Sequence, residues 1–471
     1  MEDVIQKPTG VARCPRGPST QEIVHRDGRP VPPVLEQESG QFLGDEDIPF
    51  ERYTSRAFYD LEMERMWPRV WQWACREEHI PEVGDYYVYD IGHHSIIVVR
   101  SNDGIKAYHN SCLHRGTKLR SSGTDGHASE LRCPFHGWSW TLEGGLSRLP
   151  CEWDVPHVAN NRDAFSLPEV RVGLWGGFVF INMDPDAPSL EEYLDVLPEH
   201  GKRSGLESRY VAVHVQKELA CNWKVASEAF LEAYHVQETH RQIMISNGDE
   251  ASQYDVFGPH LNRIISPNGV TSPHLKAEFS EQERADSMLA GDVTSAAPVV
   301  GEGETARSVM ANRFREMLGI ANPADASTTE LLDTNGYLVF PSGHFFLGQT
   351  FPIAYRIRPL NDKVDEALFE LLVLRAVPPG EEAPEPAEPV RLKVNDSYST
   401  VPGISLSFAQ IMDQDTNITG WQQEGFRSSK RGGAVLANYQ EVRIRHAHRT
   451  LDAYLATPPG SPVRFESDGA A

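Results

Sequence analysis

The chain has 471 residues, which is enough for two or three domains with substantial cores. Its formal net charge of -23 argues against a nucleic-acid partner and against an anionic membrane surface, because either would repel it. The sequence lacks a run of about 18 apolar residues and the apolar segment of a signal peptide at its N-terminus, so we expect a cytoplasmic enzyme without a membrane partner.

Residues 1–51 are rich in proline, glycine and charge and have no sustained apolar period. We expect an N-terminal arm that packs on a neighbour or is partly disordered. Residues 59–73 have apolar side chains close to helical spacing, with Pro68 as a break. This spacing predicts a helix that leads into the first domain.

Short strands are predicted for residues 86–99, where Gly84 and Gly92 mark the turns. Further strand candidates are residues 131–132, 138–141 and 175–182. We therefore expect a small all-β domain over residues 52–184.

Two segments of this domain each combine a cysteine with a histidine: Cys112 with His114, and Cys133 with His136. A structural zinc finger usually pairs like with like, two cysteines in one segment and two histidines in the other. The mixed pairing favours a Rieske [2Fe-2S] cluster, in which two thiolates bind one iron and two imidazoles bind the other. A zinc site built from the same four residues is the alternative.

The sequences that follow, His-Arg-Gly at 114–116 and His-Gly-Trp at 136–138, resemble those of the Rieske family. The respiratory type has two additional cysteines, at positions that are Thr117 and Phe135 here. Trp138 also replaces a serine that raises the cluster potential in that type. The resemblance therefore implies a low-potential cluster, which is a better electron donor than acceptor.

Residues 185–460 are expected to form a second domain, with residues 461–471 as a tail. A helix is predicted to begin near Ser189 after Pro188, a strand over 369–376, and a helix over 438–455. Residues 378–389 are rich in proline and glutamate, which predicts a solvated loop. Residues 280–326 are polar and weakly patterned, and we expect an insertion near the entrance of the active site.

A second candidate metal site lies in residues 222–240, whose first 14 residues have helix-forming composition. Glu232 and His235 are three residues apart and would share a helix face, whereas His240 lies about 140° further around. The helix must therefore end or bulge after Tyr234 if both histidines are to bind one ion. Two histidines with a carboxylate from elsewhere would form a facial triad, which leaves positions on Fe(II) open for O₂ and substrate.

Together these patterns make residues 50–456 similar to the α subunit of Rieske non-haem iron oxygenases, the ring-hydroxylating family. The resemblance implies that His235 and His240 bind the mononuclear Fe(II) and that Glu232 is a bridging carboxylate. It also implies a late aspartate ligand. The spacing to residues 423–425 selects Asp415, and Asp413 is the second choice.

The family resemblance implies an α+β chain, in which an all-β Rieske domain precedes an α/β catalytic domain with an antiparallel sheet around a long helix (helix-grip). It also implies an enzyme. Electrons from NAD(P)H would pass through a reductase or ferredoxin to the cluster, and then to the Fe(II), where O₂ is activated to hydroxylate an aromatic or apolar substrate. Cis-dihydroxylation, monooxygenation and demethylation use the same ligands, so the sequence does not choose among them.

The family also implies a homotrimer (α3), or α3β3 with a small subunit, in which electrons cross between neighbouring chains. The bridge would run from His136, or from His114, through Glu232 of the adjacent chain to His235. Ala229 and Gln414 depart from the asparagine and glutamate that are frequent in the family.

Substrate-pocket candidates are apolar or aromatic residues that could equally belong to the core: Met244, Phe257, Phe345, Phe346 and Phe351. An electron-transfer Rieske protein with a non-catalytic, partner-binding second domain is the alternative function. It would contain two iron atoms per chain, whereas the oxygenase would contain three. A zinc-stabilised binding protein is a third possibility.

Overall fold

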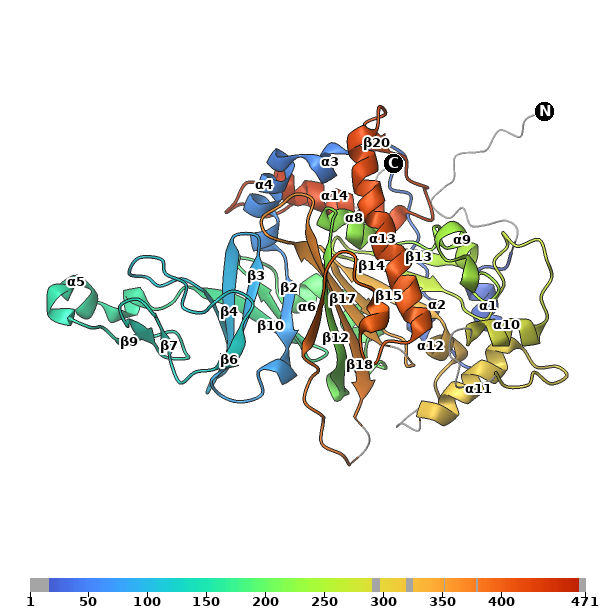
Figure 1. The fold of residues 1–471 in the computed structure, drawn as a ribbon, viewed down its shortest axis with the longest axis horizontal. Helices are drawn as coiled ribbons and strands as arrows, with labels where there is room; N and C mark the ends of the chain where they lie inside the picture. Colours follow the sequence, from blue (N-terminus) through green and yellow to red (C-terminus); the bar gives the residue numbers. More distant parts are fainter. Residues whose placement is uncertain (1–16, 290–296, 319–324, 351, 378–379, 466–471) are drawn as a thin grey trace.

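The computed structural model describes residues 17–289, 297–318, 325–350, 352–377 and 380–465 (Figure 1). Two sheets dominate it, one of seven strands and one of eight, with a smaller three-stranded sheet at one end of the molecule. Helices pack mainly around the eight-stranded sheet. This is the α+β architecture expected from the sequence.

The seven-stranded sheet is antiparallel throughout and has the order β2-β11-β10-β5-β4-β3-β6. Its strands are β2 (Gln72–Arg76), β3 (Asp85–Ile91), β4 (His94–Ser101), β5 (Gly104–His109), β6 (Asp125–His127), β10 (Glu169–Trp175) and β11 (Phe178–Asn182). The three-stranded sheet consists of β7 (Leu131–Arg132), β8 (Ser139–Trp140) and β9 (Leu146–Arg148). Near it lies one short helix, α5 (Pro156–Ala159).

The eight-stranded sheet has the order β13-β14-β15-β16-β17-β18-β12-β19, and only the β12–β19 pair is parallel. Its strands are β12 (Arg209–Leu219), β13 (Gln253–Phe257), β14 (Leu261–Ser266), β15 (Thr334–Val339), β16 (Gly343–Phe346), β17 (Ile353–Pro359), β18 (Ala367–Ala376) and β19 (Pro389–Leu392). Because the first sheet ends at Asn182 and the second begins at Arg209, we propose the boundary after residue 184.

One long helix, α13 (Leu406–Ser428), crosses the face of the eight-stranded sheet (Figure 1). Its first turn is capped by Ser405, whose side chain accepts from the N–H of Phe408. Ala409, Met412 and Thr416 are buried at helical spacing. The expected antiparallel sheet with a long helix is therefore present.

The remaining α-helices of the described residues are α1 (Thr20–Arg26), α2 (Pro33–Glu36), α3 (Glu51–Thr54), α4 (Arg56–Arg65), α6 (Leu190–Leu194), α7 (Leu197–His200), α8 (Trp223–Glu228), α9 (Val236–Thr239), α10 (Glu281–Met288), α11 (Ala306–Leu318), α12 (Thr328–Leu332) and α14 (Val442–Ala456). A short pair of strands, β1 (Ile48–Pro49) and β20 (Gly433–Ala434), joins the arm to the chain after α13. Among the described residues, no helix has the length and apolarity needed to cross a bilayer.

The described part of the N-terminal arm packs on its own chain. Thr20 donates to the carbonyl oxygen of Ala251 at 2.5 Å, and the N–H of Ser39 donates to Asp255 at 2.6 Å. Gln37 accepts from the buried guanidinium of Arg263 through its carbonyl oxygen at 2.7 Å. Residues 17–50 therefore contact the second domain of their own chain, and packing on a neighbour stays a prediction. Residues 1–16 lie outside the described part.

The two large sheets share a core. The Phe345 ring of β16 lies 5.3 Å from Trp175 and 5.1 Å from Phe178, both of the seven-stranded sheet. Arg356 of β17 donates to the carbonyl oxygen of Ala74 at 2.8 Å and pairs with the buried Glu370 of β18. A buried pair of this kind is costly to break from one side. It holds Arg356 in place, and the bond from Arg356 to Ala74 then ties the second sheet to the first.

Candidate metal centres

The two Cys/His loops belong to the all-β domain of residues 52–184 and share one backbone hydrogen-bonding pattern. In each loop the glycine after the ligand histidine donates its N–H to the carbonyl oxygen of the cysteine, at 2.9 Å for Gly116 to Cys112 and 3.1 Å for Gly137 to Cys133. Both glycines have positive φ, 76° and 77°, which other residues rarely adopt. The glycine in each motif is thus explained by the loop geometry.

The four candidate cluster ligands separate into two pairs. Cys112 and Cys133 are buried and interact through their thiols. Burial is the main cause that raises the pKa of Cys112, and the contact with Cys133 raises it further. The rings of His114 and His136 are exposed and lie 4.7 Å apart. Two buried thiols beside each other become stable thiolates only near a cation, so the donor set fits a cluster with sulfur ligands inside and imidazoles outside.

A single zinc ion would hold all four donor atoms within about 4 Å of one another, given metal–ligand distances near 2.0–2.3 Å. Among the described residues, one group of three or more potential ligands has all its donor atoms within 4.8 Å of one another. The four Cys/His residues are not that group. The paired arrangement fits a binuclear cluster better than a single ion.

That group is His235, His240 and Asp415, the three residues expected to bind the mononuclear iron. Nε2 of His240 lies 2.8 Å from Oδ1 of Asp415, and Nε2 of His235 lies 3.5 Å from the same oxygen. Asp415 and His240 are buried, and His235 is partly exposed. Two imidazoles and one carboxylate that converge in this way fit Fe(II) with open coordination positions.

A hydrogen bond orients each of the two histidines. Nδ1 of His235 lies 2.7 Å from Oε1 of Glu232, and Nδ1 of His240 lies 2.9 Å from Oε1 of Gln414. Because these oxygens accept, they would keep the ring proton on Nδ1 when Nε2 of each histidine binds a metal. Burial alone would lower the pKa of His235, but Glu232 and Asp415 raise it to about 9.

The local backbone differs from the continuous helix expected for residues 222–235. The side chain of Asn222 caps α8 by accepting from the N–H of Lys224 at 3.0 Å, but the helix ends at Glu228 rather than after Tyr234. His235 is the N-cap residue of α9, which begins at Val236. Glu232 and His235 therefore meet across a loop, where the carboxylate also accepts the N–H of His235 at 2.9 Å.

Asp413, the second choice for the late ligand, points elsewhere. It accepts from the hydroxyl of Ser397 at 2.5 Å and from the N–H of Tyr398 at 3.1 Å. Its role is to hold the loop before α13, and the structure brings Asp415 to the histidines instead.

The five pocket candidates lie in different environments. Met244 belongs to a separate small core, Phe257 packs on the ring of His200, and Phe345 contacts the first sheet. Phe346 lies on the opposite face of β16, 5.0 Å from the ring of Tyr355. Side chains alternate along a strand, so of this pair only Phe346 is on the α13 side. Phe351 is outside the described residues.

Several residues near the candidate iron site were not predicted from the sequence. Phe230 lies 5.0 Å from Tyr355 and 5.4 Å from Phe369, and the hydroxyl of Ser227 lies 2.8 Å from Nε2 of His344. The two-residue alternation that puts His344 and Phe346 on one face of β16 is the sequence signal that could have identified these residues.

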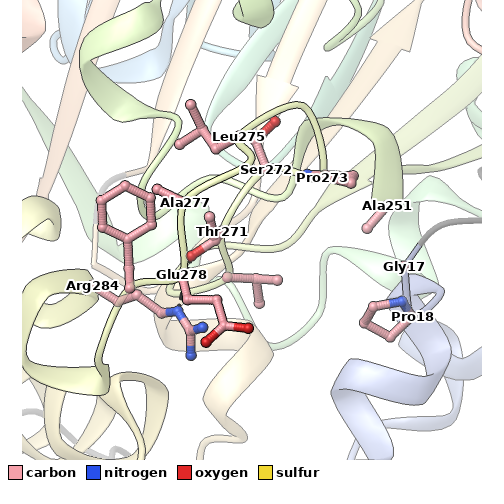
Figure 2. Close-up of a pocket in the computed structure, with 12 residues that line it drawn as sticks. Gly17, Pro18, Ala251, Thr271, Ser272, Pro273, Leu275, Ala277, Glu278 and Arg284 are labelled. Atoms are coloured by element: carbon pink, nitrogen blue, oxygen red, sulfur yellow. Dashed lines mark hydrogen bonds between the residues drawn. The ribbon is translucent and has the colours of Figure 1, made fainter.

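Most of residues 270–279, which hydrogen-bond to the segment after His240, line a cavity of about 430 Å³ (Figure 2). Thr271 and Ser272, which line it, donate to the carbonyl oxygens of Ile245 and Met244 at 2.9 Å each. Arg284 of α10 lies on the same wall, and Pro18 closes the other side. Within residues 280–326, the hydroxyl of Ser287 in α10 lies 3.0 Å from the hydroxyl of Ser246. The placement of this insertion at an active-site entrance stays a prediction.

Two family models match the chain. The Rieske [2Fe-2S] domain matches residues 70–159, and the ring hydroxylating alpha subunit (catalytic domain) matches residues 206–457, which is more than half of the chain. The chain belongs to this family. The matches confirm the family inferred from the sequence.

Among curated relatives, the glycine betaine monooxygenase oxygenase subunit of Pseudomonas aeruginosa is 27% identical over 243 residues, covering 50% of this chain and 51% of that protein. The biphenyl dioxygenase subunit alpha of Paraburkholderia xenovorans is 31% identical over 206 residues, covering 40% and 43%. The matched region thus spans about half the length of these relatives or less. A solved structure of a naphthalene 1,2-dioxygenase variant with phenanthrene has a TM-score of 0.63 at 18% identity, covering 89% of this chain and 94% of that chain, which supports the fold.

Proposed function

We propose that this chain is the oxygenase subunit of a Rieske oxygenase system that hydroxylates an aromatic or other apolar organic substrate. The observation that carries the proposal is the convergence of His235, His240 and Asp415 within 4.8 Å in a chain that also has two mixed Cys/His loops. An electron carrier needs no such second site, so this convergence disfavours the alternative of a non-catalytic second domain.

In this proposal Cys112, His114, Cys133 and His136 hold a [2Fe-2S] cluster, and His235, His240 and Asp415 hold Fe(II). When bound, the two groups would supply one-electron transfer and O₂ activation, with electrons from NAD(P)H through a reductase or ferredoxin. The protein contributes orientation: Glu232 and Gln414 keep the protons of the two histidines on Nδ1.

Electron transfer between chains is supported by the positions of the two sites. The β7–β8–β9 sheet and α9 lie at opposite ends of the molecule (Figure 1). His114 and His136 are exposed, so a second copy can reach them. We therefore propose a ring of subunits, a homotrimer with or without a small subunit, in which Glu232 of one copy meets His136 of the next.

The proposed substrate pocket lies between α13 and the eight-stranded sheet. Phe230, Phe346, Tyr355 and Phe369 offer aromatic faces there, and Tyr355 is close enough to Asp415 for that carboxylate to raise its pKa further, after burial. Aromatic faces bind flat apolar rings and also cations such as methylated ammonium groups. A quaternary ammonium substrate is therefore a second candidate, in line with the glycine betaine relative.

The test is a single turnover with the protein alone. The cluster is reduced with dithionite, excess reductant is removed, and ¹⁸O₂ is added with naphthalene, biphenyl, glycine betaine or no substrate. The proposal expects rapid cluster oxidation with one substrate class and ¹⁸O in its product. Slow oxidation that no substrate accelerates would contradict it.

A further inference from the structure

The loop that carries Glu232 is held from behind by two buried side chains. Nη1 of Arg443 donates to the carbonyl oxygen of Leu231 at 3.1 Å, and the N–H of Ala233 donates to the hydroxyl oxygen of Tyr254 at 3.0 Å. These groups belong to the two peptide planes on either side of the Glu232 Cα. Both planes that set the direction of the Glu232 side chain are therefore fixed.

These two side chains are themselves firmly anchored. Arg443 of α14 and Tyr254 of β13 are each 1% exposed. Nε of Arg443 donates to Oδ1 of Asn262 in β14 at 2.6 Å, and Nη2 donates to the carbonyl oxygen of Gly336 in β15 at 3.5 Å. A planar guanidinium fork bound at several points has little freedom to move, so the loop is tied to three neighbouring strands.

Glu232 needs such support because it lies between α8 and α9, outside both helices. Its carboxylate accepts hydrogen bonds from both the backbone N–H and Nδ1 of His235. A shift of the loop would therefore move the carboxylate and the histidine ring together.

We propose that Arg443 and Tyr254 are positioning residues for the electron-transfer bridge: they fix the two peptide planes of Glu232 so that its carboxylate can hold His235 and meet the cluster of a second copy. This inference rests on the proposed function of Glu232. Neither residue touches the candidate ligands through a contact described above, and both act through the loop backbone.

The deciding variant is Tyr254→Phe, which removes one oxygen from a buried ring. Tyr439→Phe is the matched control, because its ring packs edge-on to Tyr254 at 5.2 Å and its hydroxyl donates to the carbonyl oxygen of Ser252 at 3.2 Å. The first readout is amide hydrogen exchange in a peptide covering residues 231–236 of the iron-depleted protein. Exchange should be faster in Tyr254→Phe and at the wild-type rate in Tyr439→Phe.

The second readout is the rate of cluster oxidation by O₂ with naphthalene or glycine betaine, whichever supports oxidation in the wild type. Misplaced reacting groups slow a reaction steeply, so Tyr254→Phe should be slower by at least about tenfold at unchanged iron and sulfide content. Arg443→Lys keeps the charge but loses the planar fork, and should be slow as well.

Wild-type exchange in Tyr254→Phe, or a wild-type oxidation rate despite faster exchange, would overturn the inference. A wild-type rate of cluster oxidation in Arg443→Lys would show that Arg443 is not a positioning residue. If the wild type itself shows no substrate-dependent oxidation, the proposed function fails, and the exchange experiment still decides whether the two side chains hold the loop.

Discussion

Nδ1 of His240 lies 2.9 Å from Oε1 of Gln414, the residue that precedes Asp415 in α13. One helix thus supplies a candidate iron ligand and also orients another ligand. Gln414 is a departure from the glutamate expected in the family, yet its amide oxygen accepts from a histidine as a carboxylate would.

We predict that Gln414→Leu weakens iron binding, because the His240 ring loses the acceptor that fixes its tautomer. Loss of such a partner typically costs about 10–100-fold in metal affinity. Iron retention after dialysis against graded chelator measures this. Gln414→Glu, which keeps an acceptor, is the control and should retain iron as the wild type does. Equal retention in Gln414→Leu would show that this hydrogen bond is unimportant.

Asp415→Ala and Asp413→Ala should separate the two candidates for the late ligand. We expect Asp415→Ala to lose the mononuclear iron and keep the cluster, so that iron falls from about three to about two per chain at constant sulfide. Asp413→Ala should keep all the iron and lower the melting temperature, because Ser397 and Tyr398 lose their acceptor. The reverse pattern of iron loss would make Asp413 the ligand.

Glu232→Gln should keep both metals and slow electron transfer by at least about tenfold, and Glu232→Ala should nearly stop turnover. The amide still reaches His235 but carries no charge, whereas alanine offers the histidine no acceptor. Single-turnover cluster oxidation is the measurement. An alanine variant with full activity would remove Glu232 from the pathway.

Glu441 should make the protein less stable above neutral pH. Burial raises the pKa of Glu441 to about 7; the N–H of Ala437 opposes this, Glu232 and Glu228 add to it, and Arg445 lowers it. The pKa of Glu441 is higher in the folded protein than in the unfolded chain. The contribution of the protonated Glu441 carboxyl to stability is therefore complete below about pH 4 and is lost as the pH rises through 7.

The free energy of unfolding at pH 6 and pH 8 should therefore change less in Glu441→Gln than in the wild type, by on the order of 1–2 kcal/mol. Urea unfolding at both pH values measures it. Glu424→Gln, at an exposed position of α13, is the control. An identical pH dependence in Glu441→Gln and the wild type would refute the assignment.

The sequence predicted which side chains converge at the candidate iron site better than it predicted the local backbone that carries them. His235, His240 and Asp415 follow from the family spacing, because a metal site tolerates little change in ligand order. The end of α8 at Glu228 did not follow, since residues 229–235 have helix-forming composition. Tertiary contacts override that preference: Arg443, which is 212 residues from Leu231, and Tyr254, which is 21 residues from Ala233, bind the loop instead.

Side-chain direction was the other limit. Phe345 and Phe346 are adjacent and equally apolar, and a one-residue difference in register decides which of them faces α13. The N-terminal arm was also unpredictable, because its partners Ala251 and Asp255 are more than 200 residues away and no periodic pattern marks them.

The most direct test of the two-site account is the iron and acid-labile sulfide content per chain of anaerobically purified protein, with an electron paramagnetic resonance spectrum after dithionite reduction. The account predicts about three iron atoms, two sulfides and a Rieske-type signal. Two iron atoms with two sulfides, unchanged after Fe(II) is added, would leave an electron carrier and contradict the assignment of His235, His240 and Asp415.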